Sequence, residues 1–239
     1  IVAYALLAVA LAVAAVAFAS LLTRPEPKPP APRPQFGQFR PTTGGLEGAS
    51  QIAEFVAPRY RLPSGKQMVA VAAGPLSVQE TPIPAIAIQE NAQGSDGDVQ
   101  VVPAENAVVY SLCGLGKDCS IPEGKPSRVR GRLVRREAIE LALYTFAYVD
   151  GADSTLAFIP PPKGKTAPYL VYFRREDLDL DERVKAAFVE ARPPPPGQMT
   201  RAEATAIDTL TIPRTFKFAF RQLQDGRPIL VLEPLESTA

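Results

Sequence analysis

Five arginines lie within nine residues of this chain and form its densest group of chemically functional side chains. Guanidinium groups bind phosphate and carboxylate through paired hydrogen bonds, so the cluster predicts a site for an anion or for the acidic surface of a partner. No aromatic residue is interleaved to stack on bases, which argues against nucleic acid. The alternation around them also fits a strand with one solvated face. The cluster consists of Arg128, Arg130, Arg132, Arg135 and Arg136.

The two cysteines, Cys113 and Cys119, lie in the glycine-containing segment CGLGKDC. Their close spacing indicates a short disulfide, which in turn indicates an oxidising compartment. The alternatives are two reduced thiols or half of a metal site. The chain holds no histidine and no third cysteine to complete such a site.

The sequence contains none of the common catalytic motifs, and the alternative is a pair of carboxylates that are distant in the chain, which would leave no motif. Without histidine there is no Ser-His-Asp triad and no Cys-His pair. The nucleophile elbow, the Walker loop and the Gly-x-Gly-x-x-Gly fingerprint do not occur either. We therefore expect a protein that is not an enzyme, with no catalytic residue, cofactor or metal, and we identify no small-molecule substrate.

Two acidic segments offer oxygen atoms to a cation, but neither has the spacing of a calcium loop. In the run from Glu176 to Glu182, an EF-hand would need glycine at the position of Glu182 and glutamate at that of Phe188. This run predicts a solvated helix start, since acidic residues favour the positive end of a helix. Asp96 and Asp98 predict a turn.

Composition sets the broad class. Of 239 residues, 46% are hydrophobic and 21% charged, which excludes wholesale disorder. The net charge of +1 excludes a nucleic-acid binder that works by bulk charge. Proline is over-represented, at 26 residues.

Residues 1–22 are uncharged and apolar, and as a helix they would span roughly 33 Å, enough to cross a bilayer core. We interpret them as a single transmembrane helix in contact with membrane lipid. The alternatives are a cleaved signal peptide, for which Ala17-Phe18-Ala19 would be the cleavage site, and a buried helix. Residues 23–50 follow as a linker. Its first part holds seven prolines in Thr23–Pro41 and predicts a stiff polyproline II spacer, with a docking strip for a partner as the alternative, and Thr42–Ser50 is glycine-rich.

This order of segments resembles the layout of energy-transducing envelope proteins of the TonB kind. Those proteins have an N-terminal membrane helix, a spacer with Glu-Pro and Lys-Pro repeats, and a small C-terminal domain. The family's signalling helix uses a histidine, which this chain lacks. The resemblance therefore implies an architecture and assigns no functional residue.

Sequence features disagree about the side of the membrane on which the domain lies. Arg24, Lys28, Arg33 and Arg40 follow the predicted span, which favours the cytoplasm. The predicted disulfide and the order anchor–spacer–domain favour the outer face of a bacterial inner membrane. We place the domain outside, as the extracytoplasmic part of a single-pass protein of the inner (cytoplasmic) membrane.

Residues 51–239 predict an α+β fold with antiparallel hairpins. We expect a β-rich segment over 51–126 and an α+β core over 127–239; the alternative is that 51–239 form one domain. The expected strands are 68–72, 85–88, 99–102, 107–112, 155–159, 169–173 and a hairpin over 216–232 turning at Asp225-Gly226. The expected helices are 135–149, 180–191 and a short one capped at Thr200.

These features together predict a structural or assembly subunit of a cell-envelope membrane complex. Its extracytoplasmic domain would bind other membrane or envelope proteins through the membrane helix, the arginines or an open strand edge. The alternative is a membrane-tethered ligand-binding or sensor domain. That alternative predicts a closed pocket lined by the aromatic residues Tyr144, Tyr148, Tyr169 and Tyr172.

Overall fold

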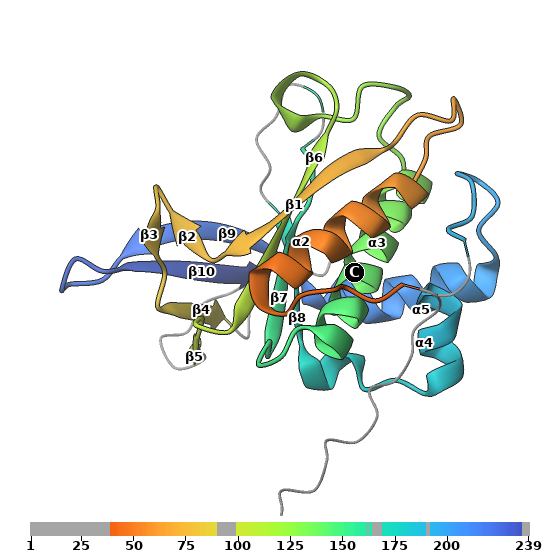
Figure 1. Ribbon diagram of the computed structural model, residues 1–239. Coiled ribbons are helices and arrows are strands. Elements are labelled where there is room, and N and C mark those ends of the chain that lie inside the picture. Colours follow the sequence, from red (N-terminus) through yellow and green to blue (C-terminus); the bar gives the residue numbers. More distant parts are fainter. Residues whose placement is uncertain (1–38, 90–98, 162, 164–168, 190–191, 236–239) are drawn as a thin grey trace, which may run out of the picture. The chain divides into compact units, whose positions relative to one another are not determined.

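An eight-stranded sheet with helices along one face makes up the part of the chain that the computed structural model describes (Figure 1). The described residues are 39–89, 99–161, 163, 169–189 and 192–235, and all belong to the unit Pro34–Ala239. The predicted span and most of the predicted spacer lie outside this range. Among the described residues, no helix is both long enough and apolar enough to cross a membrane.

The sheet is mostly antiparallel and has the strand order β1–β6–β7–β8–β9–β10–β4–β5. Two neighbouring pairs, β6 with β7 and β10 with β4, are parallel. Helix α3 (Arg128–Tyr148) makes the crossover between β6 and β7, as a parallel pair requires. A mixed α+β domain is thereby confirmed. The strands are β1 (Val69–Pro75), β4 (Ala85–Gln89), β5 (Val99–Pro103), β6 (Ala107–Gly114), β7 (Ser154–Phe158), β8 (Tyr169–Arg174), β9 (Thr215–Gln222), β10 (Pro228–Pro234) and a separate pair, β2 (Ser77–Val78) and β3 (Thr81–Pro82).

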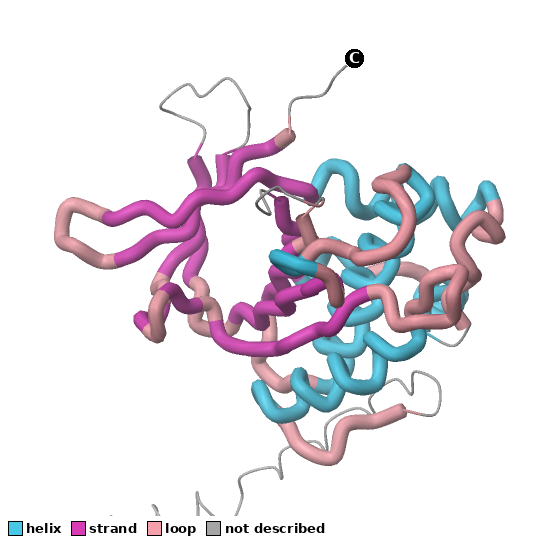
Figure 2. The backbone as a smooth tube through the Cα atoms, turned by 90° about the horizontal axis from the view of Figure 1, so that it is seen from above, coloured by secondary structure: helices cyan, strands magenta, loops and turns pink. Residues whose placement is uncertain are grey.

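The helical layer gathers beside one face of the strands, as Figure 2 shows. It consists of α2 (Gly45–Val56), α3 (Arg128–Tyr148), α4 (Glu182–Val189) and α5 (Arg201–Thr211), with short 3-10 turns η1 (Ala57–Arg59), η2 (Lys117–Cys119), η3 (Arg175–Leu178) and η4 (Ile212–Arg214). Helix α3 packs against the other three helices and the sheet, and from Arg136 to Thr145 every residue is buried. It is therefore the central element of this layer.

Each face of the sheet carries its own core because side chains alternate along a strand. On β6, Val108, Tyr110 and Leu112 pack under the helices. Val109, between them, belongs to a second apolar cluster on the opposite face, with Phe216 and Leu230 among its members. The second face is not covered by a helix of the described chain, so it is the one with room for a binding site.

The predicted linker is shorter than expected, because α2 begins at Gly45 within the segment interpreted as glycine-rich linker. Ala49, Ile52 and Val56 follow one another at helical spacing and are buried, and this burial outweighs the low helix propensity of glycine. Gly48 has a steric role, since a Cβ there would lie 2.4 Å from the carbonyl oxygen of Thr43. Gly48 thus permits the close approach of the chain at Thr43 to this helix.

Two other local predictions differ from the structure. Helix α3 starts at Arg128, seven residues before the predicted start, because the Ser127 side chain accepts a hydrogen bond from the Arg130 amide. The strand interpretation of the arginine segment is therefore wrong. The turn at Asp225-Gly226 is a three-residue loop: Leu223 N donates to Arg227 O, and Gly226 alone in the loop has a positive φ, of 82°. It is therefore a turn with a glycine bulge instead of the two-residue type I′ turn.

Candidate functional site

The predicted arginine cluster is built into the helical layer. Arg132 Nη2 donates to Asp208 Oδ2 at 2.6 Å, and Arg135 Nη2 donates to Asp208 Oδ1 at 2.5 Å. These bonds tie α3 to α5. Arg130 Nη1 donates to the carbonyl oxygen of Glu123 at 2.8 Å. Arg128, in contrast, is exposed.

Arg136 is fully buried and surrounded by acceptors. Its Nε donates to Glu203 at 2.7 Å, and its Nη1 donates to the hydroxyl of Tyr60 at 2.7 Å. Its Nη2 donates to the carbonyl oxygen of Ala187 at 3.1 Å, and its Nη1 lies 3.3 Å from Glu140 Oε2. Four of the five arginines therefore have partners within the chain, and they do not converge on one surface. As an anion-binding set they stay a prediction.

Two buried carboxyl groups lie one turn apart on α3, and they differ in their hydrogen bonding. Glu140 accepts hydrogen bonds from Arg59 and, at 2.7 Å, from Tyr60. Burial raises the pKa of Glu140 to about 7, although Arg59 and Tyr60 work against the rise. Neither oxygen of Glu137 has a hydrogen-bond partner among the described residues. Burial, followed by the nearby charge of Glu140, raises the pKa of Glu137 well above its ordinary value. These groups belong to the interior of the helical layer.

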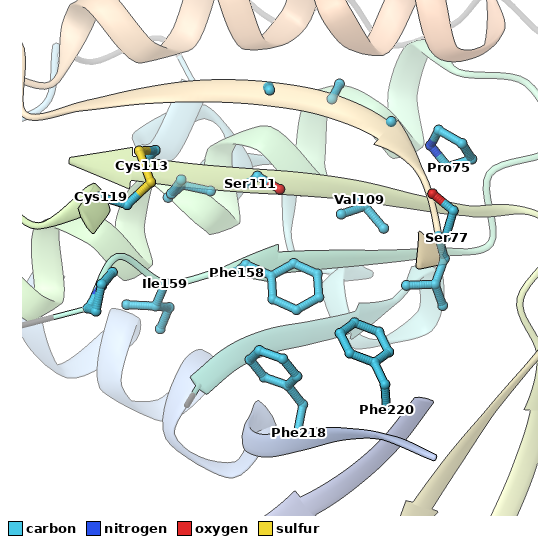
Figure 3. Close-up of a pocket in the computed structure, with 16 residues that line it drawn as sticks. Pro75, Ser77, Val109, Ser111, Cys113, Cys119, Phe158, Ile159, Phe218 and Phe220 are labelled. Carbon is cyan, nitrogen blue, oxygen red and sulfur yellow. A yellow bond between two sulfur atoms is a disulfide. The ribbon is translucent and has the colours of Figure 1, made fainter. Parts of the chain in front are cut away.

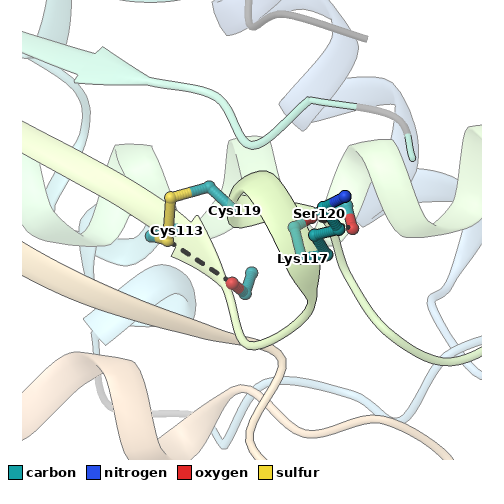
Figure 4. Close-up of a disulfide and its surroundings, with 5 residues drawn as sticks. Cys113, Lys117, Cys119 and Ser120 are labelled. Atoms are coloured by element: carbon teal, nitrogen blue, oxygen red, sulfur yellow. Dashed lines mark hydrogen bonds between the residues drawn. A yellow bond between two sulfur atoms is a disulfide. The ribbon is translucent and has the colours of Figure 1, made fainter. Parts of the chain in front are cut away.

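The predicted disulfide between Cys113 and Cys119 is present (Figure 4). It joins the end of β6 to η2 with a Cα–Cα distance of 4.5 Å. The loop is tight, because a Cβ on Gly114 would lie 2.3 Å from the backbone of Ser120. Ser120 Oγ donates to the carbonyl oxygen of Lys117 at 2.7 Å and closes the turn. The disulfide thus fixes a rigid end to β6.

An apolar groove of about 530 Å³ lies on the sheet face away from the helices, next to this disulfide (Figure 3). Strands β1 and β9 both line it, although β6, β7 and β8 lie between them in the sheet. The sheet is therefore curved, and the groove follows its concave face. The lining residues are Ala72, Ala73, Gly74, Pro75, Leu76, Ser77, Val109, Ser111, Leu112, Cys113, Cys119, Phe158, Ile159, Pro161, Phe218 and Phe220.

Three phenylalanines form the aromatic side of the groove. The rings of Phe158 and Phe218 meet edge to face at 4.8 Å between centroids, and those of Phe218 and Phe220 lie 5.8 Å apart. Exposure rises along β9, from 7% at Phe216 to 41% at Phe220. Phe216, Phe218 and Phe220 alternate with Lys217, Ala219 and Arg221, and such alternation predicts that the three rings share one face of the strand, as the ring contacts confirm. These rings form a row that runs from the second core out to solvent.

The groove can bind apolar groups but holds little that could react with them. Its polar side chains are the hydroxyls of Ser77 and Ser111, and no titratable group lines it within the described chain. The four tyrosines named for the ligand-binding alternative do not line this groove, and that alternative stays a prediction. Tyr144 and Tyr148 stack on each other in the helical layer, 6.2 Å apart, and Tyr172 is buried. The sequence signal for the residues that do line the groove is the alternation of phenylalanines in β9.

The acidic run from Glu176 to Glu182 extends from η3 to the first residue of α4. No group of three or more His, Cys, Asp or Glu residues in the described part of the chain is arranged to hold a metal ion. Asp177 bonds to Arg214 at 3.0 Å, and Asp181 Oδ1 accepts from the Arg183 amide at the start of α4. The interpretation as a helix start is thus confirmed for Asp181. Asp96 and Asp98 lie outside the described residues.

Comparisons with known proteins give no relative for this chain: no family model matches it, and no curated protein or solved structure is significantly similar to it.

Proposed function

We propose that the chain is a membrane-anchored subunit of a cell-envelope assembly, and that its concave sheet face binds an apolar segment of a partner protein. The observation that carries the proposal is the groove lined by Phe158, Phe218 and Phe220, with Phe220 41% exposed. Monomeric proteins rarely keep large apolar side chains together at the surface unless something binds there. The predicted span at 1–22 supplies the anchor, and the disulfide supports an extracytoplasmic domain of an inner-membrane protein.

The first described residues lie on the side opposite the groove. Phe39 stacks on Phe55 of α2 at 4.1 Å and meets Tyr144 of α3 edge to face at 5.8 Å. The first described residue therefore packs on the helical layer and does not line the groove.

The expected affinity is modest for a groove of this size. A leucine or phenylalanine side chain gains about 1.5–3 kcal/mol on leaving water. Two or three such anchors give roughly 3–9 kcal/mol before the cost of association is subtracted. That gain suits a membrane assembly, since two proteins in one membrane meet at a high effective concentration.

Co-purification of matched variants tests this proposal. The tagged chain and its Phe220→Ser and Ile212→Ser variants would be extracted from native membranes in mild detergent, and bound proteins quantified by mass spectrometry. Both side chains are exposed, at 41% and 58%, but only Phe220 lines the groove. We expect a stoichiometric membrane partner that is retained by Ile212→Ser and reduced at least fivefold by Phe220→Ser. Equal retention by both variants would refute the role of the groove.

A membrane-tethered ligand-binding domain is the second candidate function. It is favoured by the groove volume of about 530 Å³, which falls in the range of small-ligand pockets. In that case the chain would leave the membrane without a protein partner. Organic extraction would then release a small apolar molecule from the wild-type chain and less of it from Phe220→Ser.

A further inference from the structure

The eight-stranded sheet has two edges, and the described elements cover them unequally. Helix α2 packs against β1 at the first edge. At the second edge lies β5, in which Val99 is 47% and Val101 61% exposed (Figure 1). Its sequence, VQVVP, contains no charged residue, although proteins commonly protect an open edge with charges or with a covering segment. This edge is therefore suited to pair with a further strand.

The hydrogen bonding between β4 and β5 determines which backbone groups of β5 point outward. Ala104 N donates to the carbonyl oxygen of Pro84 at 3.0 Å, so these residues occupy a hydrogen-bonded position just beyond the two strands. Hydrogen-bonded and non-hydrogen-bonded positions alternate along an antiparallel ladder, so Ala87 and Val101, three positions further, form a non-hydrogen-bonded pair. The N–H and C=O groups of Val99 and Val101 therefore face away from β4.

Pro103 supports this assignment independently. It lies two residues beyond Val101 and has the same orientation, so its nitrogen, which carries no hydrogen, also faces outward. A proline there removes no hydrogen bond from the sheet. Gln100, between the two valines, directs its backbone groups towards Ile88 of β4. The edge thus offers a short pairing stretch that is centred on Gln100.

The stretch Val99–Gln100–Val101 has the same residue types in both directions and is therefore complementary to a second copy of itself. A twofold axis beside Gln100 would place Val99 of each copy opposite Val101 of the other, where their outward N–H and C=O groups can bond to each other. We propose that two copies of this chain pair antiparallel through β5 and join their sheets into one. This inference goes beyond the proposed function and does not depend on the groove.

Side chains on one face of the sheet favour the same pairing. Val101 lies in register with Ala87, Val231 and Ala219, which gives an apolar row across β5, β4, β10 and β9. A second copy would extend this row with its own Val99. An uncharged strand pairs with its copy without the repulsion that like charges directly opposite each other cause. Because the contact is short, we expect a weak dimer, which suits two chains anchored in one membrane.

Cysteine cross-linking of the tagged full chain in intact cells tests the pairing and its register. The two cysteines of the chain are bonded to each other, so an introduced cysteine is its one free thiol. Residue 100 would lie about 4.5 Å from its own copy between Cα atoms, whereas residue 99 would lie about 7–8 Å from its own copy. With copper phenanthroline, Gln100→Cys should therefore give at least about fivefold more disulfide-linked dimer than Val99→Cys or the exposed control Ile212→Cys.

Mixed chains check the register a second time. Val99→Cys chains that are produced together with differently tagged Val101→Cys chains should cross-link to each other about fivefold more than either does to itself. The reason is that positions 99 and 101 of the two copies would face each other at about 5.5 Å between Cα atoms.

A proline variant distinguishes strand pairing from mere proximity. Val101→Pro removes an N–H that faces away from β4, so the sheet of each copy loses no hydrogen bond. In the Gln100→Cys background it should lower the dimer yield at least about fivefold, with little change in the melting temperature. Val101→Thr keeps both the N–H and the β-branched shape, so it is the matched control and should retain the dimer.

Three results would overturn the inference. The first is an equal dimer yield from cysteines at positions 99, 100 and 212. The second is a Gln100→Cys yield that Val101→Pro leaves unchanged. The third is a Gln100→Cys adduct with a different protein, which would assign the edge to a strand of that protein. None of these results bears on the groove, which is tested separately through Phe220.

Discussion

Replacing Glu137 by glutamine is expected to stabilise the protein at neutral pH. Glu137 is fully buried, and its two carboxyl oxygens have no hydrogen-bond partner among the described residues. Burial raises the pKa of this carboxyl well above its ordinary value of 4.5, so the folded state holds it in the neutral form. The unfolded chain releases that proton near pH 4.5. Folding at pH 7 must therefore take up a proton, which costs about 1.4 kcal/mol per pH unit, or about 3 kcal/mol.

The pH dependence follows from the same reasoning. The folded state binds the proton more tightly than the unfolded state, so the contribution of Glu137 to stability is most favourable below pH 4.5 and becomes less favourable as pH rises towards the folded pKa. Glutamine resembles the neutral acid in shape and needs no proton. Glu137→Gln should therefore gain up to about 3 kcal/mol over wild type at pH 7 and almost nothing at pH 4.5.

The assay is urea unfolding followed by circular dichroism, on the full chain in detergent, between pH 4.5 and 8. Glu140→Gln is the matched control, since this residue is also fully buried on α3 but accepts hydrogen bonds from Arg59 and Tyr60. It should destabilise the protein by about 3–5 kcal/mol at pH 8, where the carboxylate is charged and its loss removes the charge that pairs with Arg59 and one of the two carboxylates beside Arg136. A loss of stability in Glu137→Gln at pH 7, or an unchanged pH profile, would refute the reasoning.

Three further predictions concern the rigid parts of the groove. Reducing the disulfide, which closes a short loop, should lower the free energy of unfolding by about 2 kcal/mol, as measured by denaturation with and without dithiothreitol. Gly114→Ala should lower the free energy of unfolding by about 1–3 kcal/mol, because its Cβ would lie 2.3 Å from the backbone of Ser120. Gly74→Ala has open space around the added Cβ and should lower it by less than about 1 kcal/mol. Similar melting curves for the two variants would contradict this prediction. Changing Gln79 and Glu80 together to Asn-Gly should stabilise the protein by about 1–2 kcal/mol, because that pair suits two positive φ values, and a lower melting temperature would count against a strained turn.

The local elements could be predicted because their signals are contained in short segments. Cys113 and Cys119 are only six residues apart, so closing the loop between them costs little chain entropy. The phenylalanines of β9 alternate with period two, and Thr200 precedes a helix whose third residue, Glu203, donates its amide to the threonine hydroxyl at 3.1 Å. Such features depend on neighbours in the sequence, and the structure confirms them.

The groove could not be predicted because it depends on contacts between distant segments. The curvature that brings β1 towards β9 arises from the whole sheet. The partners of Arg132 and Arg136 come from α5, about seventy residues later in the chain. The arginines therefore resembled a surface site in the sequence, although most of them are structural. Helix α2 escaped prediction because its glycines outweighed the buried positions Ile52 and Val56 in the pattern.

Photo-crosslinking from inside the groove would test the central claim most directly. p-Benzoylphenylalanine in place of Phe220 extends the existing ring into the groove, and the same residue in place of Ile212 labels the exposed end of the helical layer. After irradiation of native membranes, we predict a protein adduct of one defined mass from position 220, at several times the yield from position 212. Equal yields from the two positions, or adducts with lipid alone, would contradict a groove that binds a partner protein.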